Sequence, residues 1–261
     1  MSAMNIAATG MMAQETNVQV IANNIANLNT TAFRRQRPEF QDLLYQTERR
    51  EGANSSDNNT IVPVGVQIGT GVQTAAVYQI TTQGNLAQTG NPLDLAIQGL
   101  GFFQILQPNG TIAYTRDGSF QLSPTGEIVT ADGYIVQPGI TVPQNTTAVS
   151  INATGQVQAQ IAGQTNPQTI GQLQLATFPN QAGLELLGQN LYAQTAASGS
   201  PVLGNPGTTV FGTLQQGFLE ASNVDIVTEI TNMITAQRAY EMNSKVIQTS
   251  DQMMSTLSQI Q

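Results

Sequence analysis

Residues 4–28 read MNIAATGMMAQETNVQVIANNIANL, and residues 236–260 read AQRAYEMNSKVIQTSDQMMSTLSQI. In the first stretch one row recurs at alternating spacings of three and four: Met4, Ala7, Met11, Gln14, Val18, Ile21, Ile25 and Leu28. The second stretch repeats the pattern with Ala236, Ala239, Asn243, Val246, Ser250, Met253, Leu257 and Ile260. Such a period is typical of a helix that buries one narrow row against another helix. We therefore expect two long helices that pair with each other or with copies of themselves.

The predicted helix ends follow from polar residues that compete for backbone hydrogen bonds. The first helix is expected from about Met4 to Asn29, because the run 27–31 (NLNTT) favours a stop. The second is expected to begin near Ser222-Asn223 as N-cap, with Asp225 in its first turn, and to continue to about Ile260. Since both rows carry Ala, Gln, Asn or Ser, we expect the two segments to become ordered only when they dock.

The residues between the helices predict an antiparallel β body. Turn dipeptides recur about every eight residues, at Asn109-Gly110, Asp117-Gly118, Thr125-Gly126 and Asp132-Gly133. The predicted strands are Ile112–Thr115, Phe120–Leu122, Ile128–Thr130, Tyr134–Val136, Val149–Ile151, Val157–Ile161, Leu173–Phe178 and Asn190–Ala193. Upstream, Phe33–Arg50 indicates a short helix or a packed extended arm, Glu51–Asn59 a loop and Ile61–Gly71 an extended segment.

These elements predict an α+β protein, in which a mainly antiparallel β body is flanked by long N- and C-terminal helices that pair as a coiled coil. The expected domains are 1–30 (first helix), 31–72 (arm and insertion), 73–210 (β-rich body) and 211–261 (return segment and second helix).

Composition excludes most catalytic classes. The 261 residues contain no Cys and no His, so disulfides, thiolate metal sites and His-dependent triads are excluded. The single lysine, Lys245, lies in a predicted helix, which excludes a P-loop. The net charge of −8 argues against nucleic acid as a partner. We expect no enzyme activity and no catalytic, cofactor or metal site.

Short motifs have simpler structural interpretations. Gly69-Thr70-Gly71 lacks the third glycine of a dinucleotide fingerprint and is predicted to be a bend, whereas Gly99-Leu100-Gly101 predicts a bulge or a close strand approach. Asp117-Gly118-Ser119 predicts a turn and not an aspartic protease. A glycosidase-like carboxylate pair stays open, although the chain has no Trp to stack on a sugar.

Charge is scarce and unevenly placed. Charged residues make up 9% of the chain, against about 25% in an average protein. Five of the eight basic residues fall between Arg34 and Arg50. This cluster is either a solvated face, a surface that pairs with the acidic surface of a neighbouring copy, or a contact with another component such as a ring protein or a membrane. The first residues lack a basic region and an apolar core, so a cleaved signal peptide is not expected.

Two segments resemble the signatures of the bacterial flagellar basal-body rod and hook proteins. The first is ANNIANLNTTAF at residues 22–33, where the family usually has Gly in place of Ala32 and Lys near Arg34. The second combines NMI at 232–234 with QRAYEMNSK at 237–245. Further segments resemble the distal-rod members of this family: QR at 36–37, DLLYQT at 42–47, QIGTGV at 67–72, YTRDGSF at 114–120 and TSDQM at 249–253.

The resemblance implies a structural subunit of the distal rod that self-assembles into a rigid tubular shaft and transmits torque to the hook. It implies export without a cleaved signal peptide through the flagellar type III apparatus, a location in the periplasm-spanning rod, and a stiffening insertion at about 46–71. Implied partners are further copies, proximal rod proteins, the hook protein, the P- and L-ring bushing proteins and the rod cap. The expected assembly interface comprises Met4, Met11, Val18, Ile21, Asn23, Asn24, Ile25, Asn27, Phe33, Asn232, Gln237, Arg238, Tyr240, Asn243, Val246, Met253 and Leu257.

Three alternatives stay open at this point. The chain could be a proximal rod or hook homologue. It could also be a β-rich adhesive or carbohydrate-binding module with oligomerising ends, or a hydrolase that works without His or Cys. Deletion of a terminal helix distinguishes a rod or hook subunit from a binding module. The binding module would still bind its ligand, whereas the rod subunit would no longer assemble.

Overall fold

The computed structural model describes residues 2–51, 64–164 and 166–260, and the side chains of Ser2, Leu257 and Ile260 are not described. Most of the predicted loop Glu51–Asn59 and the start of the predicted segment Ile61–Gly71 therefore lie outside the described residues. The chain forms two compact units, one from residues 1–26, 36–79 and 225–261, the other from residues 27–35 and 80–224. The predicted α+β class, with two helices flanking an antiparallel β body, is confirmed.

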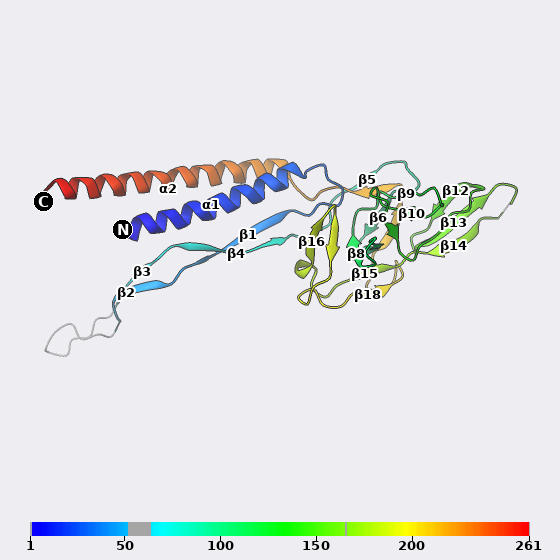
Figure 1. Ribbon diagram of the computed structural model, residues 1–261, viewed down its shortest axis with the longest axis horizontal. Coiled ribbons are helices and arrows are strands. Elements are labelled where there is room, and N and C mark those ends of the chain that lie inside the picture. Colours follow the sequence, from blue (N-terminus) through cyan, green and yellow to red (C-terminus); the bar gives the residue numbers. More distant parts are fainter. Residues whose placement is uncertain (1, 52–63, 165, 261) are drawn as a thin grey trace. The chain divides into compact units, whose positions relative to one another are not determined.

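The first unit, here called the helical unit, consists of two antiparallel helices and a β ribbon (Figure 1). Helix α1 spans Ser2–Ala26 and helix α2 spans Ile226–Ile260. With 35 residues against 25, α2 is ten residues longer, about 15 Å at the helical rise, and its end runs past the start of α1. Neither helix, as far as the chain is described, has a stretch long and apolar enough to cross a membrane.

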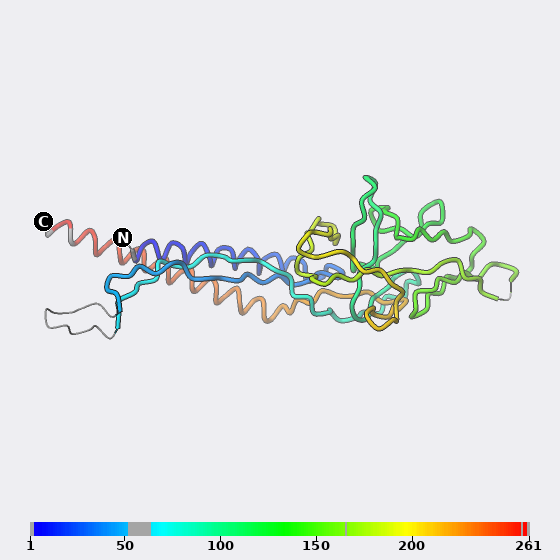
Figure 2. The backbone as a smooth tube through the Cα atoms, turned by 90° about the horizontal axis from the view of Figure 1, so that it is seen from below, coloured from blue at the N-terminus to red at the C-terminus, as the bar shows by residue number. Residues whose placement is uncertain are grey.

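The ribbon lies along α1, as Figures 1 and 2 both show. It contains the antiparallel pairs β1 (Gln36–Asp42) with β4 (Val72–Gln79) and β2 (Tyr45–Arg49) with β3 (Val66–Gly69). The segment predicted as a short helix or an extended arm is thus extended. The ribbon contacts α1 at Thr9, whose hydroxyl accepts a hydrogen bond from the amide of Val72 at 3.3 Å. A side chain at Gly71 would come within 2.2 Å of that hydroxyl, which explains the glycine.

The second unit, here called the β body, is built from short antiparallel strands. Its main sheet has the order β16-β17-β8-β7-β11-β10-β9, and β15 pairs with both β7 and β18. These strands are β7 Phe102–Leu106, β8 Ile112–Thr115, β9 Gln121–Leu122, β10 Ile128–Val129, β11 Ile135–Val136, β15 Leu175–Thr177, β16 Glu185–Gly188, β17 Leu191–Ala193 and β18 Val202–Gly204. All described strand pairs are antiparallel, as the sequence predicts.

Smaller sheets complete the β body. Three strands pair in the order β12-β13-β14, β6 pairs with β19, and β5 pairs with β20. Their bounds are β5 Leu86–Gln88, β6 Leu95–Gln98, β12 Thr146–Ile151, β13 Gln156–Ile161, β14 Gln168–Gln172, β19 Thr213–Gln216 and β20 Phe218–Glu220, and one 3₁₀ turn spans Gln181–Gly183. The eight predicted strands all fall on observed ones, and no end differs by more than three residues.

The core of the β body lies on both faces of β7. On one face Phe103 and Ile105 pack with residues such as Phe120 and Leu175; on the other Phe102 packs with Phe178. The aromatic rings meet edge to face, for example Phe102 and Phe178 at 5.9 Å between centroids, which is a favoured geometry. Because both faces are buried, β7 has no alternation of apolar and polar residues, and the sequence does not predict this central strand.

Glycine sets two of the predicted close approaches. Gly99 and Gly101 have φ of +107° and +144°, and a side chain at either would come within about 3 Å of its neighbours, as the predicted close strand approach requires. Gly118, in the predicted turn, would place a side chain 1.7 Å from the carbonyl oxygen of Leu95. Asp117 closes this turn by accepting the amide of Ser119 at 3.0 Å.

Candidate assembly surface

Small residues bring α1 and α2 together in the helical unit. Gly10 lies opposite Asn243, where a side chain on residue 10 would come within 2.8 Å of the Asn243 amide nitrogen. Asn24 lies opposite Glu229. Asn24 is fourteen residues after Gly10 on the first helix, and Glu229 is fourteen residues before Asn243 on the second. This constant register places Ala236, which is buried, between the two contacts. The helices therefore form an intramolecular hairpin, and the row that contains Ala236, Asn243 and Ser250 faces the partner helix.

Asn24 joins three segments of the helical unit at the closed end of the hairpin. Its side chain is 1% exposed. The amide nitrogen donates to the carbonyl of Gln36 at 2.9 Å and to a carboxylate oxygen of Glu229 at 3.2 Å, and the amide oxygen accepts the Gln36 amide at 2.9 Å. The first helix, the ribbon and the second helix are thus held together by one buried side chain. This explains in physical terms why an asparagine stands in the first motif.

Asp225, and not Ser222 or Asn223, caps α2. Its carboxylate accepts the amide of Val227 at 3.1 Å and the hydroxyl of Thr228 at 2.7 Å, so the predicted N-cap is wrong by two residues. The predicted end of α1 near Asn29 is also late, because the helix ends at Ala26 and Asn27 accepts the amide of Thr30 in a turn.

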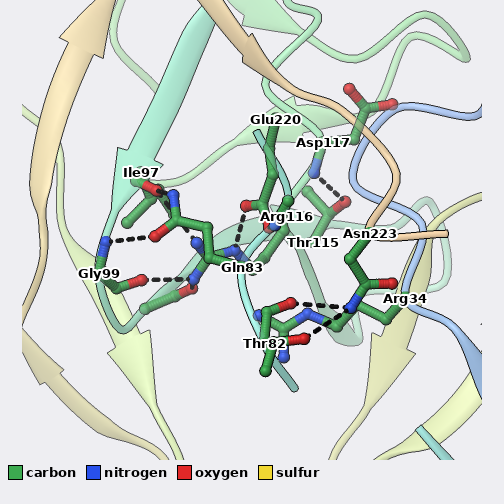
Figure 3. A network of polar contacts seen from close by, with 12 residues as sticks. Arg34, Thr82, Gln83, Ile97, Gly99, Thr115, Arg116, Asp117, Glu220 and Asn223 are labelled. Atoms are coloured by element: carbon green, nitrogen blue, oxygen red, sulfur yellow. Dashed lines mark hydrogen bonds and ion pairs between the residues drawn. The ribbon is translucent and has the colours of Figure 1, made fainter. Parts of the chain in front are cut away.

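Asn223 is used instead to join two connecting segments within the β body (Figure 3). Its amide nitrogen donates to the carbonyls of Ile80 at 3.1 Å and Thr82 at 2.8 Å, and its amide oxygen accepts the amide of Arg35 at 2.7 Å. Asn223 also donates its own amide to the carbonyl of Phe33 at 3.3 Å. Two segments of the β body, residues 33–35 and 80–82, at which the chain passes to the helical unit, are therefore bonded to a single residue.

A buried ion pair lies close by in the β body. The guanidinium of Arg116 donates to the carboxylate of Glu220 at 2.7 Å, with side-chain exposures of 1% and 2%. Its Nη1 donates to the carbonyls of Gly99 at 2.8 Å and Gly101 at 2.9 Å, and its Nη2 donates to the carbonyl of Ile97 at 3.0 Å. The buried charge is therefore paired, and each of its three nitrogens donates a hydrogen bond.

Arg34 is buried in the β body, which contradicts all three interpretations of the basic cluster for this residue. It is 4% exposed, lies over the ring of Phe102 at 5.5 Å and donates to the side chain of Gln181 at 3.1 Å. Burial, and secondly the nearby Arg116, lower the pKa of Arg34. By contrast, the exposed Arg37 on the ribbon stacks on Tyr78.

Ala32 takes the left-handed backbone conformation that the resemblance suggests for this position. Its φ is +57°, its side chain is 3% exposed, and its amide donates to the carbonyl of Glu220 at 2.7 Å. Alanine tolerates this region less well than glycine does. The residue is held there by its hydrogen bond and by burial of its methyl group.

The expected interface residues divide by exposure within the single chain. Ile21 and Asn24 are buried. Half-buried are Met4, Met11, Val18, Ile25, Asn27, Phe33 and Asn243. Exposed are Asn23, Asn232, Gln237, Arg238, Tyr240, Val246 and Met253. Asn27 and Phe33 belong to the β body and the others to the helical unit. The side chain of Leu257 lies outside the described residues.

One side of the hairpin forms an open groove. It is lined by Glu15, Val18, Gln19, Gln237, Tyr240 and Glu241. Val18 belongs to the row Met4, Met11, Val18 and Ile25, and Tyr240 to the row Met233, Tyr240, Ile247 and Met254. Both rows repeat every seven residues, so they lie along one edge of each helix. The sequence predicts the first row. The second row lies beside the predicted seam, and of its residues only Tyr240 is among the expected interface residues.

Further exposed apolar residues lie on α2 and on the ribbon. At the start of α2, Ile226, Ile230 and Ile234 follow one another every four residues and are exposed. On the ribbon the exposed apolar residues are Phe40, Leu44, Tyr45, Val64, Val66, Ile68 and Val77. A two-stranded ribbon with apolar side chains in water is marginally stable by itself. These surfaces are therefore suited to contact other protein. The resemblance points to part of the ribbon as a stiffening insertion, whereas the sequence does not single out the start of α2.

A hairpin of two heptad-patterned helices with open apolar rows, joined to a compact β body, is typical of a structural subunit. Sequence comparison gives the particular family. Residues 4–34 match the family described as flagella basal body rod protein, residues 96–159 the flagellar hook protein FlgE/F/G D1 domain, and residues 215–260 the flagellar basal body rod FlgEFG protein C-terminal.

Relatives extend the match to the full chain. The flagellar basal-body rod protein FlgG of Caulobacter vibrioides is 58% identical over 100% of this chain and 99% of its own length. The protein of that name from Bacillus subtilis is 40% identical over 95% of each chain. The flagellar basal-body rod protein FlgF of Caulobacter vibrioides is 34% identical over 94% of this chain and 92% of its own length. The chain belongs to the flagellar basal-body rod protein family, a family of structural proteins of the flagellum.

Proposed function

We propose that this chain is a structural subunit of the distal part of the flagellar basal-body rod, where it self-assembles into a rigid tubular shaft that transmits torque to the hook. The main observation that supports this proposal is the hairpin, because its two helices leave heptad rows open to solvent on either side of a groove. Full-length similarity to rod proteins supports the same conclusion. A rod subunit needs no catalytic group, and we assign it none.

The open rows of the hairpin are the proposed contacts between copies. Met4, Met11, Val18 and Ile25 on α1 present apolar side chains at heptad spacing, and so do Val246 and Met253 on α2. Tyr240 is exposed on the second row of α2, which also repeats every seven residues. The exposed amides Gln237 and Asn232 flank them. We further propose that residues 1–30 and 211–261 act as the inner helical domain of the assembly, residues 31–72 as an arm and stiffening insertion, and residues 73–210 as the outer domain.

The arm is the second proposed contact. Its exposed apolar residues include Leu44, which is 88% exposed, and Tyr45, which covers Gly69 in the ribbon. Burying Leu44 against a neighbouring copy would stabilise the contact by about 1.5–3 kcal/mol. Arg49 and Arg50, exposed at the tip of β2, would pair with acidic groups of that neighbour.

Other components follow from the place of a rod in the flagellum. We propose proximal rod proteins, the hook protein, the ring bushing proteins and the rod cap as neighbours. We also propose a periplasm-spanning location, reached through the flagellar type III export apparatus without a cleaved signal peptide. The open helical rows support the first proposal, because each new neighbour in a shaft requires a complementary helical surface.

Assembly of the purified chain on sheared basal-body seeds tests the proposed function. The variant Val246→Glu places a carboxylate on an open row, whereas Gln252→Glu places one on an exposed site about 120° around α2 and is the control. We expect V246E to keep its helical circular dichroism and to lose growth on seeds, and Q252E to assemble as the wild type does. Equal growth of V246E and the wild type would refute the proposed interface, and failure of the wild type to extend any seed would refute the function.

A further inference from the structure

In the part of the chain that the structure describes, every methionine lies in one of the two helices. The chain has eight methionines, at positions 1, 4, 11, 12, 233, 242, 253 and 254, and the seven from Met4 onward fall within α1 and α2. The β body has none, and the chain has no cysteine. Thioethers are therefore the only sulfur of this protein, and among the described residues the helices carry all of it. Because the chain also lacks Trp and His, these thioethers are its main groups that react with peroxides.

Three of these methionines lie open on α2. Met242 is 62% exposed, Met253 59% and Met254 45%. Met242 and Met253 share one face of the helix with Val246, at spacings of four and seven residues. Met254 continues the row Met233, Tyr240 and Ile247, and the register of Gly10 with Asn243 and of Asn24 with Glu229 places it beyond the start of α1. Met253 and Met254 thus stand on the rows proposed to contact a neighbouring copy, and Met242 lies on the same face as Val246 and Met253.

We propose that Met242, Met253 and Met254 form an oxidation-sensitive modification site, at which conversion to the sulfoxide by a hydroperoxide prevents the free subunit from assembling. This inference rests on the proposed function. The sulfur lone pair attacks one oxygen of the peroxide, the O–O bond breaks and an S–O bond forms. Sulfur loses two electrons, and the departing peroxide oxygen takes up a proton and leaves as water or an alcohol.

The sulfoxide is tolerated by the free chain but not by an assembled one. On the exposed face of a helix the new S–O dipole is solvated, so the hairpin keeps its fold. Packing that face against another helix removes water from the dipole without supplying a donor, and burial of an unpaired polar group is unfavourable. Oxidation therefore separates folding from assembly, and a sulfoxide reductase, which returns the thioether, makes the block reversible.

Peroxide treatment of the monomer before seeding tests the site. Wild-type chain is oxidised with hydrogen peroxide until mass spectrometry shows sulfoxide at all three positions, and its critical concentration on seeds is compared with that of untreated chain. We expect at least about a tenfold rise, equivalent to about 1.4 kcal/mol, with unchanged circular dichroism. Treatment with methionine sulfoxide reductases A and B and a thiol reductant should return the original value.

Leucine variants locate the effect. The variant M242L/M253L/M254L cannot be oxidised at the site, so its critical concentration after peroxide should equal its own value before. Met12, 68% exposed on α1, gives the control M12L, which should stay as sensitive as the wild type.

Two results would overturn the inference while leaving the proposed function intact: oxidised wild type that assembles normally, or a triple variant that peroxide blocks as strongly as the wild type. Untreated chain that never extends seeds would instead refute the proposed function, and the inference with it.

Discussion

Replacing Glu220 with Gln should strongly destabilise the β body. The Glu220 carboxylate accepts the Arg116 guanidinium at 2.7 Å and the Gly84 amide at 3.2 Å, in a site where both charged side chains are at most 2% exposed. Glutamine keeps the volume but removes the charge, and it leaves the buried guanidinium without a counterion. Breaking a buried pair on one side is unfavourable by about 3–5 kcal/mol.

Urea unfolding, followed by circular dichroism, measures this loss. With an m-value of about 2 kcal/mol/M, a loss of about 4 kcal/mol lowers the unfolding midpoint by about 2 M. Glu185→Gln on the exposed strand β16 is the matched control and should change the free energy of unfolding by less than about 0.5 kcal/mol. Arg116→Met should be worse than E220Q, because it also leaves the carbonyls of Ile97, Gly99 and Gly101 without their donor. A loss below about 1 kcal/mol in E220Q would refute the reasoning.

Three further predictions concern single buried residues. Asn24→Ala removes three hydrogen bonds and should destabilise the helical unit by about 2–3 kcal/mol. Hydrogen exchange at the Gln36 amide measures this, and exchange as slow as in the wild type would contradict it. Ala32→Val forces a branched side chain into φ +57° and should lower the free energy of unfolding by at least about 2 kcal/mol. Ala32→Gly, the control, should stay within about 1 kcal/mol of the wild type. Thermal unfolding measures both, and equal melting temperatures of A32V and the wild type would be the contrary result. Burial raises the pKa of Tyr114 above its ordinary 10.0, so the folded state holds this proton more tightly and stability is lost as the pH rises above 10. Tyr114→Phe should lose less stability than the wild type between pH 9 and pH 11, as urea unfolding at both values would show, and parallel losses would exclude this residue as the cause.

The β body was predictable where turns are local. Strand Ile112–Thr115 was predicted with the bounds it has, because Asn109-Gly110 and Asp117-Gly118 mark both of its ends. Strand β7 was not, because burial of both faces removes the alternation that identifies a strand. The ribbon was ambiguous for a different reason: Arg37 pairs with Tyr78, too far along the chain for any local pattern to show.

Side-chain roles were harder to predict than elements. Asn223 looked like a helix cap, but the carbonyls of Ile80 and Thr82 bind it from a distance of more than 140 residues in sequence. All three interpretations of the basic cluster place Arg34 on the surface, and only the fold brings Phe102 and Gln181 to it. The heptad rows were visible because they repeat locally, but which of them faces α1 and which stays open depends on the register of the hairpin. The contacts between copies remain a prediction.

The two helices that close the hairpin lie on opposite sides of the β body in sequence, and this fixes an order of events. Asn24 meets Glu229 across a separation of 205 residues, whereas most of the β body is the continuous stretch 80–224. If the chain emerges from a narrow passage with residue 1 leading, the β body can collapse as soon as residue 224 is through, while α1 must wait for its partner. Closing so long a loop is slow for a bare chain, but a folded body between the ends shortens the search. The hairpin is then the last part to form, at the moment when a waiting neighbour can still compete for its open edge.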